Sequence, residues 1–96
     1  MTDTFYRRLG LCRRSGKLLL GADTIQKTGA TVHAAFLASD ASDRVDRLCR
    51  KKTERVFVLD RSKAELGHLL GCHEVAAAAV CDKRFAEALL QSFEGE

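Results

Sequence analysis

The sequence predicts an α/β fold, a single-domain three-layer α/β/α sandwich around a small, mostly parallel mixed sheet. Segments with helical periodicity alternate with short apolar runs along the whole chain, which is typical of α/β proteins. The runs at residues 33–40, 55–60 and 75–81 are apolar on both faces, as expected of strands covered by helices on both sides. Right-handed crossovers between such strands favour parallel pairing. Because 96 residues allow one hydrophobic core, we expect residues 1–96 to form one domain.

Nine elements follow from the spacing of apolar residues and from the residues that bound each run. In the first helix, Phe5, Leu9 and Cys12 are four and three residues apart, so they share one face. In the last helix, apolar residues recur every fourth position from Phe85. In chain order, the predicted elements are helix 3–15, strand 18–20, helix 22–28, strand 33–40, helix 42–52, strand 55–60, helix 62–70, strand 75–81 and helix 82–93.

Polar residues and glycines predict where several helices begin or end. Ser62 and Glu65 have the spacing of a capping box, in which each side chain accepts a hydrogen bond from the other residue's backbone amide. Asp40 or Ser42 is suited to cap the helix that follows the second strand. Gly29 is a natural end for the second helix, because glycine commonly terminates helices.

The alanine-rich run 75–81 is ambiguous by periodicity alone, because alanine suits a helix as well as a buried strand. Its length and its flanking residues, Gly71 and Asp82, favour a strand. Gly71 then ends the preceding helix, and Asp82 caps the last one.

Positive charge is concentrated at the N-terminal end of the chain, which has a net charge of +3. Residues 1–30 hold six basic and two acidic side chains, whereas residues 31–96 hold ten basic and eleven acidic ones. A one-sided basic field favours a polyanionic partner, and a solvated helix face is the alternative explanation. No apolar run has the length of a membrane span, and the N-terminus lacks a secretory apolar region. We therefore expect a cytoplasmic protein whose four cysteines are reduced.

The sequence contains none of the common phosphate-loop, nucleophile-elbow or zinc-helix motifs. Its cysteines form no CxxC pair. His68 and Cys72 are four residues apart and His73 is adjacent, but a zinc site needs four converging ligands. We expect no catalysis, no metal site and no cofactor.

Residues 13–27 form the strongest candidate for a binding site. Three cations precede the glycine that opens a helix, namely Arg13, Arg14 and Lys17 before Gly21. A helix N-terminus offers backbone amides and the positive end of its dipole to a phosphate, and glycine permits close approach. The segment therefore predicts an anion platform beside a basic patch. The alternative is a solvated helix in which Asp23 and Lys27 pair across one turn.

Four segments follow, in order, the pattern of one known family: LGLCRRSGKLLLGADTIQK, FLASDAS, RSKAELGHLLG and CDKRFAEALL. Over residues 5–93, the chain resembles the kink-turn RNA-binding superfamily of ribosomal and snoRNP proteins, and within it the small bacterial YlxQ-like branch. This resemblance implies an α/β/α RNA-binding domain without catalysis.

The resemblance also implies a set of RNA-binding residues. In the family, a Gly-x-Asn-Glu-x-x-Lys motif at the start of the second helix reads the guanines of sheared G·A pairs. A loop after the fourth helix packs on a flipped-out nucleotide, and a nearby lysine touches the RNA backbone. The matching positions are Gly21, Asp23, Thr24 and Lys27 in the motif, Cys72, His73 and Glu74 within the loop at residues 71–75, and Lys63.

The chain departs from the family motif at two reading positions. Asp23 stands where the family has asparagine, and Thr24 stands where it has glutamate. An asparagine amide can donate to a guanine acceptor, whereas a carboxylate only accepts, for example from the N1 and N2 hydrogens of guanine. Leu19 and Leu20 replace a basic pair, for which the three cations before Gly21 are expected to compensate.

These observations predict a monomeric, non-enzymatic protein that binds structured, kink-turn-like RNA, and ribosomal RNA is one candidate target. The cations are expected to provide general phosphate affinity, while Asp23 and Lys27 contact bases. The alternative function is a protein–protein interaction module on the same fold, with kink-turn specificity lost or weakened.

Overall fold

The computed structural model describes residues 3–94 and contains the nine predicted elements in the predicted order. The first strand has the predicted bounds and the other three are shorter than expected, and the alanine-rich run is a strand, as its flanking residues indicated. The elements are α1 (Asp3–Arg14), β1 (Leu18–Leu20), α2 (Ala22–Lys27), β2 (Ala34–Leu37), α3 (Asp43–Arg50), β3 (Val56–Val58), α4 (Lys63–Leu70), β4 (Ala77–Val80) and α5 (Lys83–Glu94).

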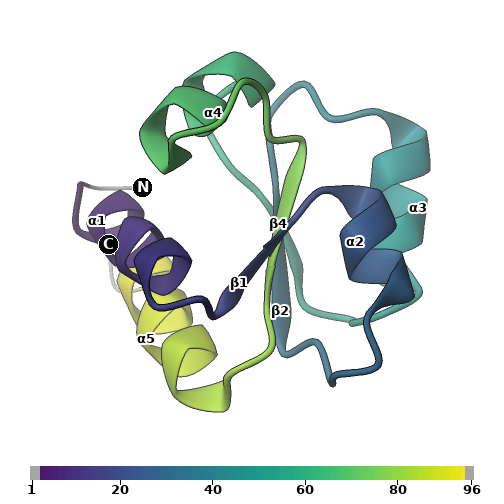
Figure 1. Ribbon diagram of the computed structural model, residues 1–96, viewed down its shortest axis with the longest axis horizontal. Helices are drawn as coiled ribbons and strands as arrows, with labels where there is room; N and C mark the ends of the chain where they lie inside the picture. The colour runs from purple at the N-terminus through teal and green to yellow at the C-terminus, as the bar shows by residue number, and fades with distance from the viewer. Residues whose placement is uncertain (1–2, 95–96) are drawn as a thin grey trace.

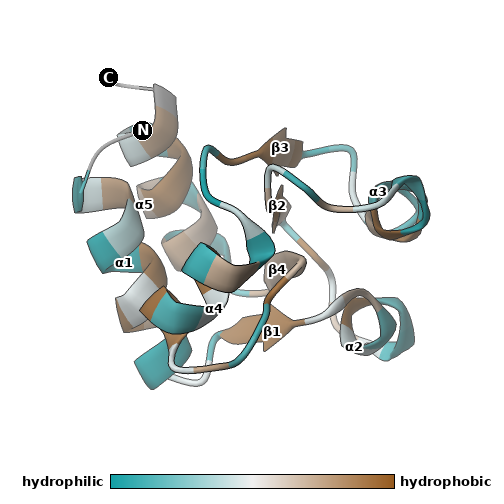
Figure 2. Ribbon diagram, turned by 90° about the horizontal axis from the view of Figure 1, so that it is seen from above, coloured by the Kyte–Doolittle hydropathy of each residue, from teal (hydrophilic) through white to brown (hydrophobic). Residues whose placement is uncertain are grey.

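The fold class is the predicted one, with helices on both faces of a four-stranded mixed sheet of order β1-β4-β2-β3 (Figures 1 and 2). The helices α1, α4 and α5 cover one face, and α2 and α3 cover the other. Successive residues of each strand point to opposite faces. Accordingly Phe36 packs in the larger core beneath α1, α4 and α5, while Leu37 packs in the smaller core beneath α2 and α3.

The expectation of mostly parallel pairing is wrong. Only β2 and β3 pair in parallel, because β4 lies between β1 and β2 and is antiparallel to both. Leu37 pairs with Val58 at the end of β3 and with Ala77 at the beginning of β4. The chain therefore leaves β3 and enters β4 at the same end of the sheet, and α4 stays near that end instead of crossing to the other (Figure 1). Alternation of helices and strands does not specify this direction.

Most of the predicted helix boundaries are confirmed. The capping box of Ser62 and Glu65 is complete, and Gly71 ends α4 in the left-handed region at φ 77°. The carboxylate of Asp82 accepts the amides of the first turn of α5, at 2.9 Å from the nitrogen of Arg84. Gly29 does not act as a left-handed cap, since α2 already ends at Thr28 in an extended conformation.

Asp40 and Ser42, the two residues predicted to cap the helix after β2, have different roles. Ser42 caps α3 by accepting from the amide of Val45 at 3.3 Å. Asp40 instead accepts from the amide of Lys63 at 2.8 Å, so its carboxylate joins the β2–α3 connection to the start of α4. This contact draws two connections together at the end of the sheet where β2 and β3 finish.

Candidate nucleic-acid interface

The start of α2 and the loop at residues 71–75 lie side by side, although they are far apart in the sequence. The amide of Gly21 donates to the carbonyl oxygen of Ala77, the first residue of β4, at 2.9 Å. Because the 71–75 loop leads into β4, it lies next to the beginning of α2 (Figure 1). The structure thus brings together the two segments that the family resemblance implicates in RNA binding.

Gly21 has a backbone conformation that favours glycine, with φ 91° and ψ 142°. An added Cβ would meet no described atom within 4 Å, so the space beside it is open. No side chain among the described residues caps α2, and Asp23 and Thr24 are exposed. The first turn of α2 therefore presents backbone and short polar side chains at the surface.

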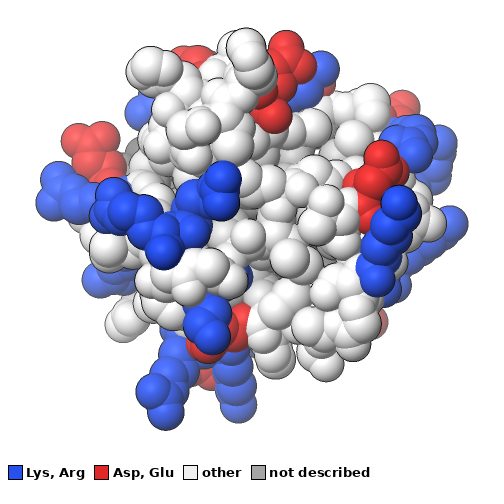
Figure 3. All heavy atoms as spheres, viewed as in Figure 1, with Lys and Arg blue, Asp and Glu red and all other residues white. Residues whose placement is uncertain are grey.

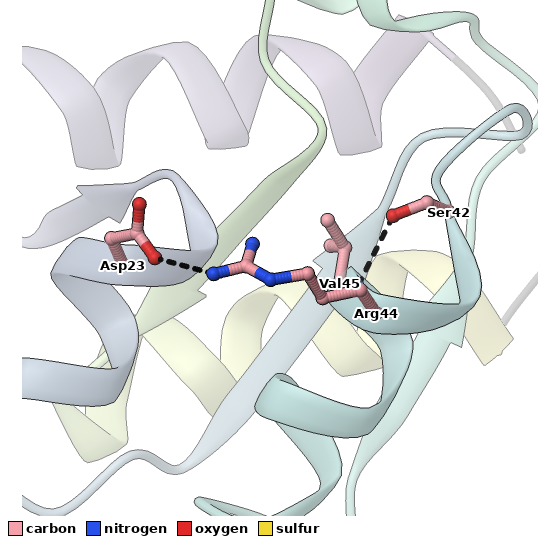
Figure 4. Close-up of polar contacts among 4 residues, drawn as sticks. All are labelled: Asp23, Ser42, Arg44 and Val45. Atoms are coloured by element: carbon pink, nitrogen blue, oxygen red, sulfur yellow. Dashed lines mark hydrogen bonds and ion pairs between the residues drawn. The ribbon is translucent and has the colours of Figure 1, made fainter.

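Asp23 pairs with Arg44 of α3, at 3.2 Å between Oδ1 and a guanidinium nitrogen (Figure 4). The second carboxylate oxygen points away from Arg44, and both side chains are largely exposed. An exposed pair of this kind contributes roughly 0–1 kcal/mol to stability. Its greater effect is to offset the negative charge of Asp23. The sequence predicted Lys27, one helical turn away, as the partner of Asp23 and did not predict Arg44. The spacing of residues within α2 carries no information about which helix packs beside it.

The 71–75 loop is packed closely on α4. The amide of Cys72 donates to the carbonyl oxygen of Gly67 at 2.7 Å, and that of Val75 donates to the carbonyl oxygen of Lys63 at 3.1 Å. A Cβ at Gly67 would lie 2.4 Å from the carbonyl oxygen of His73. Only glycine allows the loop to approach this closely, so Gly67 is a further residue on which the shape of the loop depends.

The exposure of the loop side chains differs. His73 and Glu74 are exposed, whereas Cys72 is half-buried against the larger core. Lys63 is half-buried at the start of α4 and is joined to the end of the loop through its backbone. The structure therefore places these four predicted residues around one loop.

The predicted cations do not all lie together. Arg13 reaches the loop, with a guanidinium nitrogen 3.9 Å from Sγ of Cys72, and the next residue in the chain, Arg14, is exposed. Figure 3 shows a band of Lys and Arg side chains over α1, next to a central area without charged side chains. Lys17 precedes β1, so it lies at the opposite end of this strand from Gly21, and it lines a separate hollow together with Thr28. Lys27 is exposed in the last turn of α2.

Cys12 and Cys49 are buried thiols, and Cys81 is partly buried. Burial is the main cause that raises the pKa of Cys12 to about 11, and it also raises the pKa of Cys49 and Cys81. Raised pKa values leave less thiolate at neutral pH and so lower reactivity. Within residues 3–94, no group of three or more His, Cys, Asp or Glu side chains has an arrangement that could hold a metal ion. None of the helices in this range could span a bilayer.

Comparison with known proteins supports the fold. No family model and no curated protein matches the chain. Among solved structures, the chain is similar to a protein of unknown function from Bacillus halodurans, with 26% sequence identity and a TM-score of 0.81. The similarity covers 93% of this chain and 95% of the other, so the whole α/β arrangement is shared.

Proposed function

We propose that this chain is a non-catalytic, cytoplasmic RNA-binding protein of the kink-turn-binding superfamily. Its interface would be the start of α2 together with the 71–75 loop. The observation that carries the proposal is the direct contact between the end of β1 and the start of β4, through Gly21 and Ala77. This contact aligns an open glycine turn with an exposed loop on one surface, as a structured RNA would require. The family resemblance makes ribosomal RNA the first target to test.

The charges around this surface favour an RNA ligand. Arg13 lies against the loop, so phosphates that approach the loop meet its guanidinium group. The contact with Arg44 offsets the charge of Asp23, which would otherwise repel phosphates. Its second carboxylate oxygen remains able to accept hydrogen bonds from a base. Asp23 in place of the family's asparagine is therefore compatible with binding to RNA.

The proposal is tested by titrating a labelled kink-turn duplex and a plain duplex of equal length, each at two salt concentrations. We expect the kink-turn duplex to bind at least about tenfold more tightly than the plain duplex, because recognition of its bases and shape adds to the affinity for phosphates. Arg13→Glu should weaken binding and reduce the slope of log affinity against log salt by about one, because one phosphate contact is lost.

Arg84→Glu is the matched control for this charge reversal. Arg84 is exposed in the first turn of α5, away from the loop, and the change in net charge is the same. Equal loss of affinity in both variants would mean that only overall charge matters. Equal affinity for the two duplexes would refute kink-turn recognition, and no binding to either duplex would refute RNA binding altogether.

A further inference from the structure

A hollow lies between α1 and α4, beside the 71–75 loop, and of the residues assigned to RNA binding above only Arg14 lines it. It has two adjoining parts of about 350 and 600 Å³, which share Leu69 as a lining residue. We call it the α1–α4 hollow.

Contacts at both ends of the α1–α4 hollow join α1 to the segments that flank α4. At one end, the hydroxyl group of Tyr6 in α1 donates to the carboxylate of Asp60, shortly before α4. The guanidinium group of Arg61 lies 5.0 Å from the centre of the Tyr6 ring. At the other end, Arg13 contacts Cys72, just after α4. The contact between Arg13 and Cys72 shows that the hollow adjoins the proposed RNA interface.

Part of the surface of the α1–α4 hollow, which we call its floor, is apolar. Gly10 of α1 lines it, and an added Cβ there would meet no described atom within 4 Å. Leu69 of α4 is 38% exposed, and Ala64 and His68 lie on the same helix surface. An aromatic ring fits such a floor, and an exposed imidazole can stack on a base.

Three arginines and two acidic residues line the α1–α4 hollow, so its lining carries a net positive charge that favours an anionic ligand. Arg7 and Arg14 are exposed, line the hollow and stand seven residues apart on α1, which is roughly 10 Å along the helix axis. They therefore flank the surface over Gly10. The acids among the lining residues are Asp3 and Glu65, and Glu65 accepts from the amide of Ser62 in the capping box.

We propose that a single-stranded segment of the bound RNA lies in the α1–α4 hollow, with a base over Gly10 and Leu69 and its neighbouring phosphates at Arg7 and Arg14. This inference rests on the proposed function, because the segment would extend from RNA bound at the 71–75 loop. Charge complementarity and continuity with that loop favour RNA over an apolar peptide as the occupant.

The experiment compares a blunt kink-turn RNA with the same RNA carrying a short single-stranded uridine extension, placed on each strand end in turn. We expect one of the two extended RNAs to bind about tenfold more tightly than the blunt RNA, a gain typical of one or two stacked bases. Gly10→Phe fills the floor and Arg7→Glu repels the phosphate, so each should abolish the gain while affinity for the blunt RNA changes less than about twofold. Arg84→Glu, with the same charge change as Arg7→Glu, should retain the gain.

Nuclear magnetic resonance spectra of the labelled protein keep the test decisive even if one variant is unstable. The amide signals of Gly10 and Leu69 should shift with the favoured extended RNA and not with the blunt RNA. If neither extension adds affinity while the blunt RNA still binds, the inference is wrong and the proposed function stands. If no RNA binds, both are wrong. If an acidic amphipathic peptide shifts these two signals and the extended RNA does not, the hollow is a protein-docking surface instead.

Discussion

Gly67 provides the sharpest test of how the 71–75 loop is held. An ideal Cβ at this position would lie 2.4 Å from the carbonyl oxygen of His73, 2.7 Å from its carbonyl carbon and 2.8 Å from Cα of Glu74. Real Cβ atoms essentially never approach other atoms within 3.0 Å. All three neighbours belong to the backbone, so rotation of a side chain cannot relieve the clash. Gly67→Ala must therefore displace the loop or α4.

The size of the effect follows from three contributions. Replacing glycine by alanine inside a helix gains about 1 kcal/mol of stability. Forcing an extra methyl group into a closely packed site costs about 1–3 kcal/mol. Displacing the loop also weakens the 2.7 Å hydrogen bond from Cys72 to Gly67, whose net value is about 1 kcal/mol. We expect Gly67→Ala to lower the free energy of unfolding by about 1–3 kcal/mol.

Gly10→Ala is the matched control. Gly10 lies inside α1, and its added Cβ would meet no described atom within 4 Å. Only the helical preference of alanine then acts, so this variant should gain up to about 1 kcal/mol. The same chemical change is thus expected to have opposite signs in two helices of one protein.

Urea denaturation followed by circular dichroism measures both variants, and thermal unfolding provides an independent check. For a domain of this size, each 1 kcal/mol shifts Tm by roughly 4–8 °C. Gly67→Ala should also weaken binding of the kink-turn duplex, because the loop changes shape. A Gly67→Ala variant as stable as Gly10→Ala would refute the packing argument, since the loop would then not press on α4.

Three further outcomes test other contacts. Tyr6→Phe should lower the free energy of unfolding by about 1 kcal/mol near neutral pH, because the hydrogen bond to Asp60 is lost. That hydrogen bond lowers the pKa of Asp60, so the loss should become smaller as the pH falls below 3.8, the ordinary pKa of an aspartate. Urea unfolding of both proteins at about pH 3 and at pH 7 measures this difference. Iodoacetamide should label the half-buried Cys72 before the fully buried Cys12, whose pKa is raised to about 11. Bound RNA should slow the labelling of Cys72, and mass spectrometry can follow both reactions. Asp82→Ala should destabilise the protein by about 1 kcal/mol through loss of the α5 cap, and an unchanged urea midpoint would contradict that role.

The features that could be predicted from sequence depend on residues close together in the chain. The capping box of Ser62 and Glu65 and the cap at Asp82 are confirmed, because each uses groups within three residues. The alternation of elements follows from apolar spacing for the same reason. Of the candidate interface, the sequence identified the open turn at Gly21 and, through family resemblance, the 71–75 loop.

Tertiary structure decided how these local features meet. The direction of β4 depends on where α4 returns the chain, and the apolar run that forms β4 fits either direction. The partner of Asp23 is Arg44, because α2 and α3 pack side by side on one face of the sheet. Lys17, close to Gly21 in sequence, lies at the other end of β1. Sequence by itself determined which elements form and where they end, since hydrogen bonds within a turn depend on neighbouring residues. Only the packed sheet decided which charges and loops share a surface, because those contacts join residues distant in the chain.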